Sequence, residues 1–391
     1  MEDTGSPFPP RLHFVHLPKC AGTALYQALL EAWQVAPAEV PPYFPMEQHL
    51  YSVYHRRHPN SYAEAEAGML ESLETLLGLY YEAGYRVIGA HHPFSPNLFA
   101  QFRQEVVSTT VLREPLARIR SHVLYNIFLN RSADPETKRA KDVPFDALAE
   151  LQRYLDSDRL PHIADTYAKK LGGVSPEGSV DLNLRRATER AFAAIDLIDV
   201  VGLLEHMPAY LQALEERTGR KIQIRSANTT AEFADDREQY RAAKAYLERP
   251  EIDALLRPYI QQDEVIYAYA RWRLGHAETP PVEALERLEP YRAFFGSLLP
   301  IEDSRVPSWA GEMVLATFPW VFHRELGWLK LIGQASAEEF WVERHELGEL
   351  CLRTDTYPRL YRKGTNSWLL ASPPGSGNAA IWDFAREAWI S

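Results

Sequence analysis

Residues 11–25 read Arg-Leu-His-Phe-Val-His-Leu-Pro-Lys-Cys-Ala-Gly-Thr-Ala-Leu, and this stretch decides the fold class of the chain. The apolar run over 12–17 predicts a strand, and the pattern over 23–35 predicts a helix. The Pro- and Gly-containing turn between them presents backbone N–H groups at a helix N-terminus and adds one cation, Lys19. This combination predicts a binding site for a phosphate or sulfate group.

The first two thirds of the chain repeat this alternation of strand and helix. Short β-branched or apolar runs predict strands at 86–91, 105–112 and 197–203. Apolar residues at helical spacing predict helices at 62–83, 116–130, 144–156, 162–170, 184–194 and 207–218. Strands separated by helices indicate βαβ units, and therefore an α/β fold with a parallel sheet covered on both faces. Ligands of such sheets bind beyond the carboxyl ends of the strands.

Composition limits the partners of the chain. Its 391 residues carry a net charge of −11, which argues against a general nucleic-acid binder because phosphate backbones attract basic surfaces. Cys20 and Cys351 are too few and too distant to suggest a disulfide framework or a zinc site. The N-terminus lacks the features of a signal peptide, and no run reaches the roughly 20 apolar residues of a membrane span. We therefore expect a cytoplasmic protein without nucleic-acid or membrane partners.

The pattern changes near residue 276, which predicts three parts: a domain over 1–276, a linker with a short helical stretch over 277–300, and a β-rich domain over 301–391. Strand-like runs and Gly or Pro turns in the last part suggest a small antiparallel sandwich or barrel. Seven of the nine tryptophans lie there. Five could form a sugar-stacking platform or, alternatively, fill the core of the domain: Trp309, Trp328, Trp341, Trp368 and Trp382.

A second motif occupies residues 110–122, Thr-Val-Leu-Arg-Glu-Pro-Leu-Ala-Arg-Ile-Arg-Ser-His. The predicted strand ends at Leu112, so Arg113 lies at its tip, and Ser121 follows on the next helix. An arginine and a hydroxyl brought together in this way could hold a second phosphate. The alternative is that Arg113 pairs with Glu114 and that Ser121 has no special role.

Together these motifs resemble those of the sulfotransferases, specifically the branch that contains heparan-sulfate 2-O-sulfotransferase and related bacterial carbohydrate sulfotransferases. The loop His-Leu-Pro-Lys-Cys-Ala-Gly-Thr, at 16–23, is similar to their 5′-phosphosulfate loop, which typically reads Pro-Lys-Thr-Ala-Gly-Thr. Leu-Arg-Glu-Pro-Leu-Ala-Arg-Ile-Arg-Ser, at 112–121, is similar to their 3′-phosphate motif. Segments 201–205 and 263–267 also resemble late landmarks of the branch, so the likeness covers about residues 11–275.

The resemblance implies a P-loop-type three-layer sandwich that binds 3′-phosphoadenosine 5′-phosphosulfate (PAPS) and releases the bisphosphate PAP. By position, the phosphosulfate would be held by Lys19, Cys20, Ala21, Gly22, Thr23 and Ala24, mostly through backbone N–H groups. Arg113 and Ser121 would hold the 3′-phosphate. Cys20 departs from the family, which usually has a hydroxyl residue there, and this removes one possible donor.

The expected reaction moves a sulfuryl group to an acceptor hydroxyl of a small molecule or glycan, in line and without a metal. Lys19 is the candidate for stabilising charge on the leaving oxygen. Gly-Ala-His-His-Pro at 89–93 supplies two candidate bases, His91 and His92. The resemblance implies His91, because the family commonly has a histidine two residues before the proline at this strand end. His16 is expected to cap its strand or face the core.

Three functional classes follow from these observations. The leading class is a PAPS-dependent sulfotransferase. A P-loop kinase is disfavoured because a Walker A loop ends in Gly-Lys-Ser/Thr, whereas here the lysine precedes the glycine. A non-catalytic glycan-binding protein is the third class. The acceptor pocket is expected to be built by segments 36–60 and 126–145. Glu205 is expected either to orient a neighbour at a strand end or to be an acidic residue favoured at a helix start, and Asp263 and Tyr267 are expected to pack or hydrogen-bond within the fold.

Overall fold

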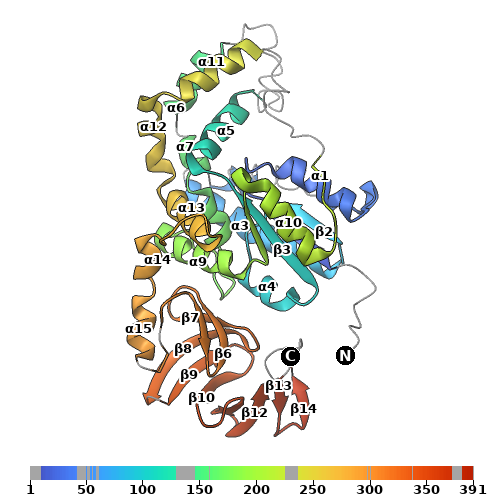
Figure 1. The fold of residues 1–391 in the computed structure, drawn as a ribbon, viewed down its shortest axis with the longest axis vertical. Coiled ribbons are helices and arrows are strands. Elements are labelled where there is room, and N and C mark those ends of the chain that lie inside the picture. Colours follow the sequence, from blue (N-terminus) through green and yellow to red (C-terminus); the bar gives the residue numbers. More distant parts are fainter. Residues whose placement is uncertain are drawn as a thin grey trace. The chain divides into compact units, whose positions relative to one another are not determined.

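The computed structural model describes residues 10–41, 50, 53–54, 56–58, 61–128, 146–157, 159–224, 237–296, 298–299, 301–336, 338–371 and 381–390. The chain forms two compact units, each with one sheet (Figure 1). The parallel-sheet unit comprises Met1–Pro93, Val107–Lys170 and Val200–Tyr267. The antiparallel-sheet unit comprises Phe94–Val106, Leu171–Asp199 and Ala268–Ser391, so it includes two segments that precede the predicted boundary at 276.

The parallel sheet has four strands, β1 (Arg11–Val15), β2 (Val87–Ala90), β3 (Val106–Leu112) and β4 (Val200–Leu203), in the order β2-β1-β3-β4. β1 is parallel to β2, and β3 is parallel to β4. The four strands predicted from apolar runs are thereby confirmed. β3 is buried along its whole length even though it contains Ser-Thr-Thr. Its two threonine hydroxyls are satisfied within the sheet, since Thr109 donates to the carbonyl of Val200 and Thr110 to that of Val15.

The strand order creates a topological switch point. From β1 the chain first adds β2 on one side and then returns to add β3 on the other side of β1. In parallel sheets the crevice at the carboxyl ends of two such strands is where ligands bind. The two motifs singled out in the sequence, at 18–23 and at 113–121, follow β1 and β3 and therefore begin at this crevice.

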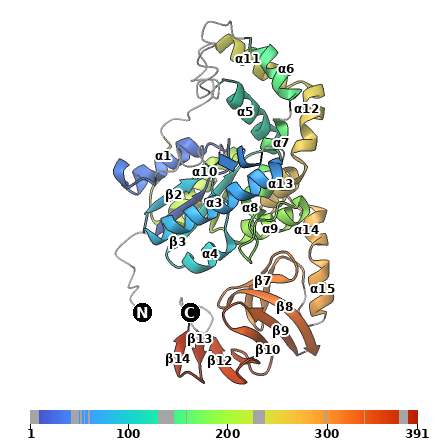
Figure 2. The same ribbon diagram turned by 180° about the vertical axis from the view of Figure 1, so that it is seen from behind.

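Helices cover both faces of the parallel sheet. α1 (Gly22–Ala32) and α10 (Met207–Thr218) pack on one face, in a core that includes Leu25, Tyr210 and Val111. α3 (Tyr62–Glu82) crosses the opposite face, as the front and back views show (Figures 1 and 2). The other helical elements that lie wholly or mostly in this unit are η1 (Pro37–Glu39), α5 (Pro115–Phe128), α6 (Ala147–Leu155), α7 (Leu160–Ile163), α8 (Thr166–Gly172), η4 (Leu204–His206), α11 (Arg237–Leu247), α12 (Pro250–Leu256), η6 (Arg257–Tyr259) and α13 (Gln261–Arg273). A second apolar cluster joins α5, α6, α11 and α12.

One helix prediction is wrong in detail. The segment 162–170 is not one helix but the end of α7 and the start of α8, separated at Asp165. Asp165 adopts a left-handed conformation with φ 41°. Its carboxylate accepts a hydrogen bond from the backbone N–H of Gln262, a tertiary contact that local periodicity does not reveal.

The antiparallel sheet contains ten strands that follow each other in chain order, each hydrogen-bonded to its sequence neighbours. They are β5 (Arg305–Ser308), β6 (Gly311–Leu315), β7 (Trp320–His323), β8 (Gly327–Ser336), β9 (Glu339–Arg344), β10 (Gly348–Arg353), β11 (Arg359–Arg362), β12 (Ser367–Ala371), β13 (Ile381–Asp383) and β14 (Ala388–Ile390). The β-rich C-terminal domain is thus confirmed, although its strands form one continuous sheet. Its inner face packs against α15 (Glu289–Phe295) through Tyr291 and Phe295. The unit also contains α4 (Pro96–Phe102), α9 (Leu184–Leu197) and α14 (Val282–Glu286).

Candidate anion-binding site

The turn after β1 has the backbone of an anion-binding nest. Lys19 and Ala21 are both left-handed, with φ of 68° and 59°, while Cys20 between them keeps a negative φ. Such an alternation points successive N–H groups into one concavity. A non-glycine residue in this conformation costs roughly 1–2 kcal/mol, so the surrounding structure must hold the turn in place.

The start of α1 adds further N–H groups to this nest. Ala21 is the N-cap and has no side-chain acceptor, and the first turn contains no acidic residue. The first helical bond runs from the N–H of Leu25 to the carbonyl of Ala21. The N–H groups of Gly22, Thr23 and Ala24 precede that bond, so they and the helix dipole favour an anion at this end. Thr23 is exposed.

The ring of His16 lies between this turn and the ring of His91. A Cβ added to Gly22 would lie 1.7 Å from Nε2 of His16, so only glycine allows this approach. The His16 ring stacks on Phe14 at 5.4 Å between centroids and lies 4.3 Å from the ring of His91. His16 is buried, as expected, and its position links the loop to the candidate base.

Lys19 is partly buried beside an aromatic ring. Its Nζ lies 3.9 Å from the ring centroid of Tyr125 on α5, a cation–π distance. Burial and the neighbouring Arg113 lower the pKa of Lys19 to about 8. The ammonium is therefore charged at neutral pH but is poorly solvated, which strengthens its attraction for an anion.

Arg113 brings the second motif to the first. It lies at the end of β3, and its Nη1 donates to the carbonyl of Lys19 at 3.2 Å. The alternative pairing with Glu114 is not what the structure shows. The carboxylate of Glu114 instead caps α5 by accepting from the backbone N–H groups of Leu116 and Ala117.

Tyr167 on α8 contacts residues of both motifs. It was not identified as a site residue from the sequence. Its hydroxyl donates to the carbonyl of Arg113 at 2.6 Å and accepts from the N–H of the same residue at 3.0 Å. The hydroxyl also lies 3.5 Å from Sγ of Cys20, which is buried. Burial raises the pKa of Cys20 to about 11, so the thiol is neutral. Cys20 therefore contacts Tyr167 as a neutral, buried thiol.

A buried ion pair, formed by Arg118 and Asp263, contacts Tyr167. The side chains of Arg118 and Asp263 are fully buried and lie 3.3 Å apart. Asp263 also accepts from the N–H groups of Tyr167 and Ala168 at 2.7 and 3.3 Å. Burial, partly offset by Arg118, raises the pKa of Asp263 to about 6. Asp263 thus acts within the fold, as predicted.

Glu205 is hydrogen-bonded to the second motif at Glu114. One carboxylate oxygen accepts from the backbone N–H of Glu114 at 2.9 Å, and the other accepts from the hydroxyl of Tyr267 at 2.9 Å. Glu205 and Tyr267 therefore orient the turn that carries Arg113, which confirms that they act through neighbouring residues.

One stripe of α5 faces the loop. Arg118, Ser121, His122 and Tyr125 are spaced i, i+3, i+4 and i+7, which places them on one side of the helix. Because Tyr125 contacts Lys19, this stripe carries Ser121 to the loop side. His122, not considered from the sequence, has a buried Nδ1. Burial and the charges of Arg118, Lys19 and His91 lower its pKa well below the ordinary value, so it is neutral.

The two candidate bases have different surroundings. His92 is fully buried, donates from Nδ1 to the carbonyl of Leu73 at 3.1 Å and packs edge-on against Tyr80. His91 is half-buried with its ring against His16. Its carbonyl accepts from Nζ of Lys170 at 2.7 Å, which fixes the backbone there. These placements favour His91 as the group that can meet a substrate.

An apolar hollow adjoins the loop. It encloses about 640 Å³ and is lined by Ala21, Ala24, Leu204, Met207, Pro208, Leu211, Ile222, Gln223 and Ile224. A volume of this order suits a small ligand or part of one. The site therefore offers an anion nest with two cations and, beside it, an apolar surface.

No protein-family model matches the chain, and a search of curated proteins finds no significant match. Among the described residues, no group of His, Cys, Asp and Glu side chains is arranged to hold a metal ion. No helix in the described part of the chain is long and apolar enough to cross a bilayer.

Proposed function

We propose that this protein is a sulfotransferase that uses PAPS to sulfate a hydroxyl of a carbohydrate or glycosylated metabolite, on a P-loop-type three-layer α/β fold. One observation carries the proposal. The guanidinium of Arg113 reaches the backbone of Lys19, so the two motifs that resemble those of the sulfotransferases meet at the switch point of the sheet.

The residues present fit the donor. The nest N–H groups, the start of α1 and Lys19 suit the 5′-phosphosulfate, with Thr23 able to add a hydroxyl. An arginine side chain has five N–H donors, and the bond to Lys19 uses one of them, so Arg113 can still bind a phosphate together with Ser121. The apolar hollow at Ala21 and Ala24 suits the purine base.

Bound in this way, PAPS would supply an activated sulfuryl group whose leaving oxygen gains negative charge during transfer. Lys19, whose ammonium lies against the ring of Tyr125, would stand beside that oxygen. Its partly desolvated ammonium stabilises developing charge more than a solvated one would, because the local dielectric is lower. The contribution is largest in the transition state, where it raises the rate.

His91 is the proposed general base. It would accept the proton of the acceptor hydroxyl, a role worth about 10²- to 10⁴-fold in rate. His16 fills the space between its ring and the loop and so sets the distance between base and donor. The acceptor pocket stays a prediction, because most of 36–60 and 126–145 lies outside the described residues.

Ligand binding tests the proposal against the kinase alternative. Isothermal titration with PAP and with ATP plus Mg²⁺ should show PAP binding at least about tenfold more tightly, since only PAP has a 3′-phosphate for Arg113 and Ser121. Equal or tighter binding of ATP would favour a kinase. Incubation with PAPS and a panel of polysaccharides and alcohols should then yield a sulfated product detectable by mass spectrometry.

Lys19→Ala gives the sharper test. We expect transfer to fall by about 10²-fold or more, as when an electrostatic donor is removed from a transition state. Lys244→Ala is the matched control, because Lys244 lies in an exposed pair with Glu248. Full activity in Lys19→Ala would refute the mechanism.

A further inference from the structure

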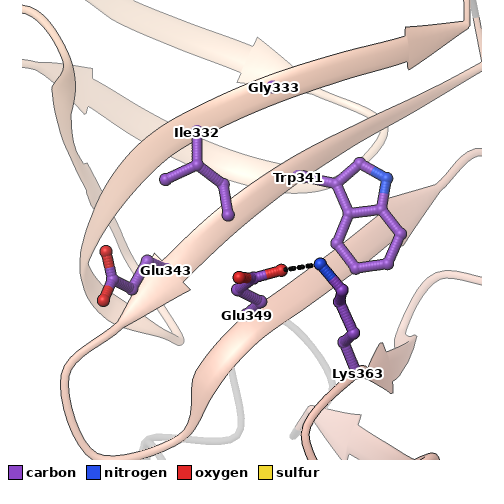
Figure 3. Close-up of a pocket in the computed structure, with 6 residues that line it drawn as sticks. All are labelled: Ile332, Gly333, Trp341, Glu343, Glu349 and Lys363. Carbon is purple, nitrogen blue, oxygen red and sulfur yellow. Dashed lines mark hydrogen bonds and ion pairs between the residues drawn. The ribbon is translucent and has the colours of Figure 1, made fainter.

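We propose that the outer face of the antiparallel sheet binds a neutral polysaccharide, with one pyranose ring seated beside Trp341. The site lies in the antiparallel-sheet unit and is independent of the proposed transferase activity. Figure 3 shows the hollow that would receive the ring, lined by Ile332, Gly333, Trp341, Glu343, Glu349 and Lys363.

Alternation along the strands separates a core face from an aromatic face. Phe340 and Val342 on β9, and Leu360 on β11, are fully buried. The residues between them point outward, and Trp341, Cys351, Tyr361 and Trp368 are successive cross-strand partners from β9 to β12. The ring centroids of Trp341 and Tyr361 are 6.3 Å apart, and those of Tyr361 and Trp368 are 5.7 Å apart. This row of aromatic residues, continued by the pair Trp382 and Trp389, extends across the sheet.

The predicted platform is therefore divided. Trp309 packs on Phe340 and Tyr357 against the core, and Trp328 packs on Phe322 and donates to the carbonyl of Pro96. These two tryptophans serve the fold. Trp341, Trp368 and Trp382 alternate with buried residues and lie on the outer face, where Trp368 is 41% exposed.

A missing side chain opens the hollow beside Trp341. Gly333 on β8 is the cross-strand partner of Trp341, and a Cβ added to it would meet no atom within 4 Å. The register shifts next to Gly333, between β8 and β9. The resulting hollow has a volume of about 450 Å³, within the approximate range of 300–1,000 Å³ for small-ligand sites.

The polar groups of the hollow suit hydroxyls. Nζ of Lys363 lies 2.6 Å from a carboxylate oxygen of Glu349 and 5.9 Å from the ring centroid of Trp341, and Figure 3 shows this ion pair beside the indole. A pyranose has an apolar C–H face that can stack on an indole and a rim of hydroxyls that can bond to an adjacent acceptor and donor.

The charges select among possible occupants. Two carboxylates, Glu343 and Glu349, and one ammonium, Lys363, line the hollow, so a sulfated or carboxylated glycan would be repelled. The apolar core of a protein–protein interface is depleted in charged residues, whereas half of the residues that line this hollow are charged. A neutral sugar chain is not repelled by the carboxylates, and its hydroxyls can bond to the charged groups that a protein partner would leave buried.

The test uses the full chain in native affinity electrophoresis with four soluble neutral polysaccharides: dextran, xylan, mannan and mixed-linkage glucan. We expect at least one to retard the protein, and Trp341→Ala to weaken that retardation at least about tenfold. Gly333→Val should do the same by filling the hollow while leaving every polar group in place. Gly364→Val is the matched control, because Gly364 also faces open space but does not line the hollow.

Two results would overturn the proposal: no retardation by any of the four, or retardation unchanged in both Trp341→Ala and Gly333→Val. Concentration-dependent dimers that disappear in Trp341→Ala would identify a second copy of the chain as the occupant and would also refute it. Unchanged far-ultraviolet circular dichroism and a cooperative melting transition confirm that each variant folds. PAP binding, measured on the same variants, tests the proposed donor site separately.

Discussion

The two sheets of this protein offer their chemistry in different places. In the parallel sheet, α1 and α10 cover one face and α3 the other (Figures 1 and 2), so the candidate ligand groups lie beyond the strand ends, in the loops and on the helices that follow them. In the antiparallel sheet, the inner face packs on its own core and the outer face carries a row of aromatic side chains. Parallel strands need crossover helices that cover both faces, whereas hairpins leave one face open.

The difference extends to what holds each site in place. The loop site depends on hydrogen bonds and charge: the hydroxyl of Tyr167 joins its two motifs, and the Arg118–Asp263 pair supports Tyr167. The aromatic face depends on cross-strand register over an apolar core. We therefore expect substitutions at polar buried groups to damage the loop site and to leave the aromatic face intact.

The largest expected effect concerns rate and would confirm that chemistry belongs to the strand ends. If the proposed function holds, His91→Gln should lower sulfate transfer by about 10²- to 10⁴-fold, because it removes the proposed general base. PAP affinity, measured by titration calorimetry, should change little, since His91 is separated from the loop by His16. His92→Gln is the control. It should lower the melting temperature without changing the rate per folded molecule, because His92 is fully buried.

Breaking the buried Arg118–Asp263 pair should destabilise the parallel-sheet unit and leave the antiparallel sheet unaffected. Asp263→Ala leaves Arg118 charged in a fully buried position and should reduce the free energy of unfolding by about 3–5 kcal/mol. Hydrogen exchange should show lost protection in α5 and α8 but not in β9 to β12. Equal loss in both sheets would contradict the comparison.

The control for that experiment replaces the pair rather than breaking it. Arg118→Met combined with Asp263→Leu should recover most of the stability, because well-packed apolar residues can substitute for a buried ion pair. Asp253→Ala, at a more exposed pair with Arg120, should cost less than about 1 kcal/mol.

A smaller effect is expected from the hydroxyl that joins the motifs. Tyr167→Phe leaves the N–H and carbonyl of Arg113 without this partner. The free energy of unfolding should therefore fall by about 1–3 kcal/mol. PAP affinity should fall by roughly tenfold, since Arg113 loses its fixed position. Tyr210→Phe removes a buried hydroxyl that contacts Thr109, and it should lower stability with PAP affinity unchanged. Unaltered PAP affinity in Tyr167→Phe would show that the loop is positioned by other contacts.

The smallest effect is a pH dependence confined to the loop site. An anion stabilises the charged form of Lys19, so its pKa is higher in the complex than the value of about 8 in the free protein. PAP affinity should therefore be full below pH 8 and decline as the pH rises above it. Lys19→Arg stays charged and should flatten this decline. A profile identical in both proteins would exclude Lys19 as the titrating group.

Local periodicity was sufficient to place most elements. The apolar runs that became β1 to β4 and the helical patterns that became α1, α3, α5, α9 and α10 are governed by short-range spacing, so they were predicted correctly. The break at Asp165 was not predicted, because it depends on a hydrogen bond to a residue 97 positions away. The same limit applies to Tyr167, whose partner Arg113 is 54 positions distant.

The sequence by itself determined the fold class and the two motifs, because strand and helix periods and the turn residues Pro18 and Gly22 act locally. Only the tertiary structure decided how those motifs are arranged in space and which residues surround them. Strand order brings Arg113 to Lys19, burial sets the pKa of Lys19, and register places Trp341 opposite Gly333. Each of these depends on residues far apart in the chain, and their proximity is a property of packing rather than of local pattern.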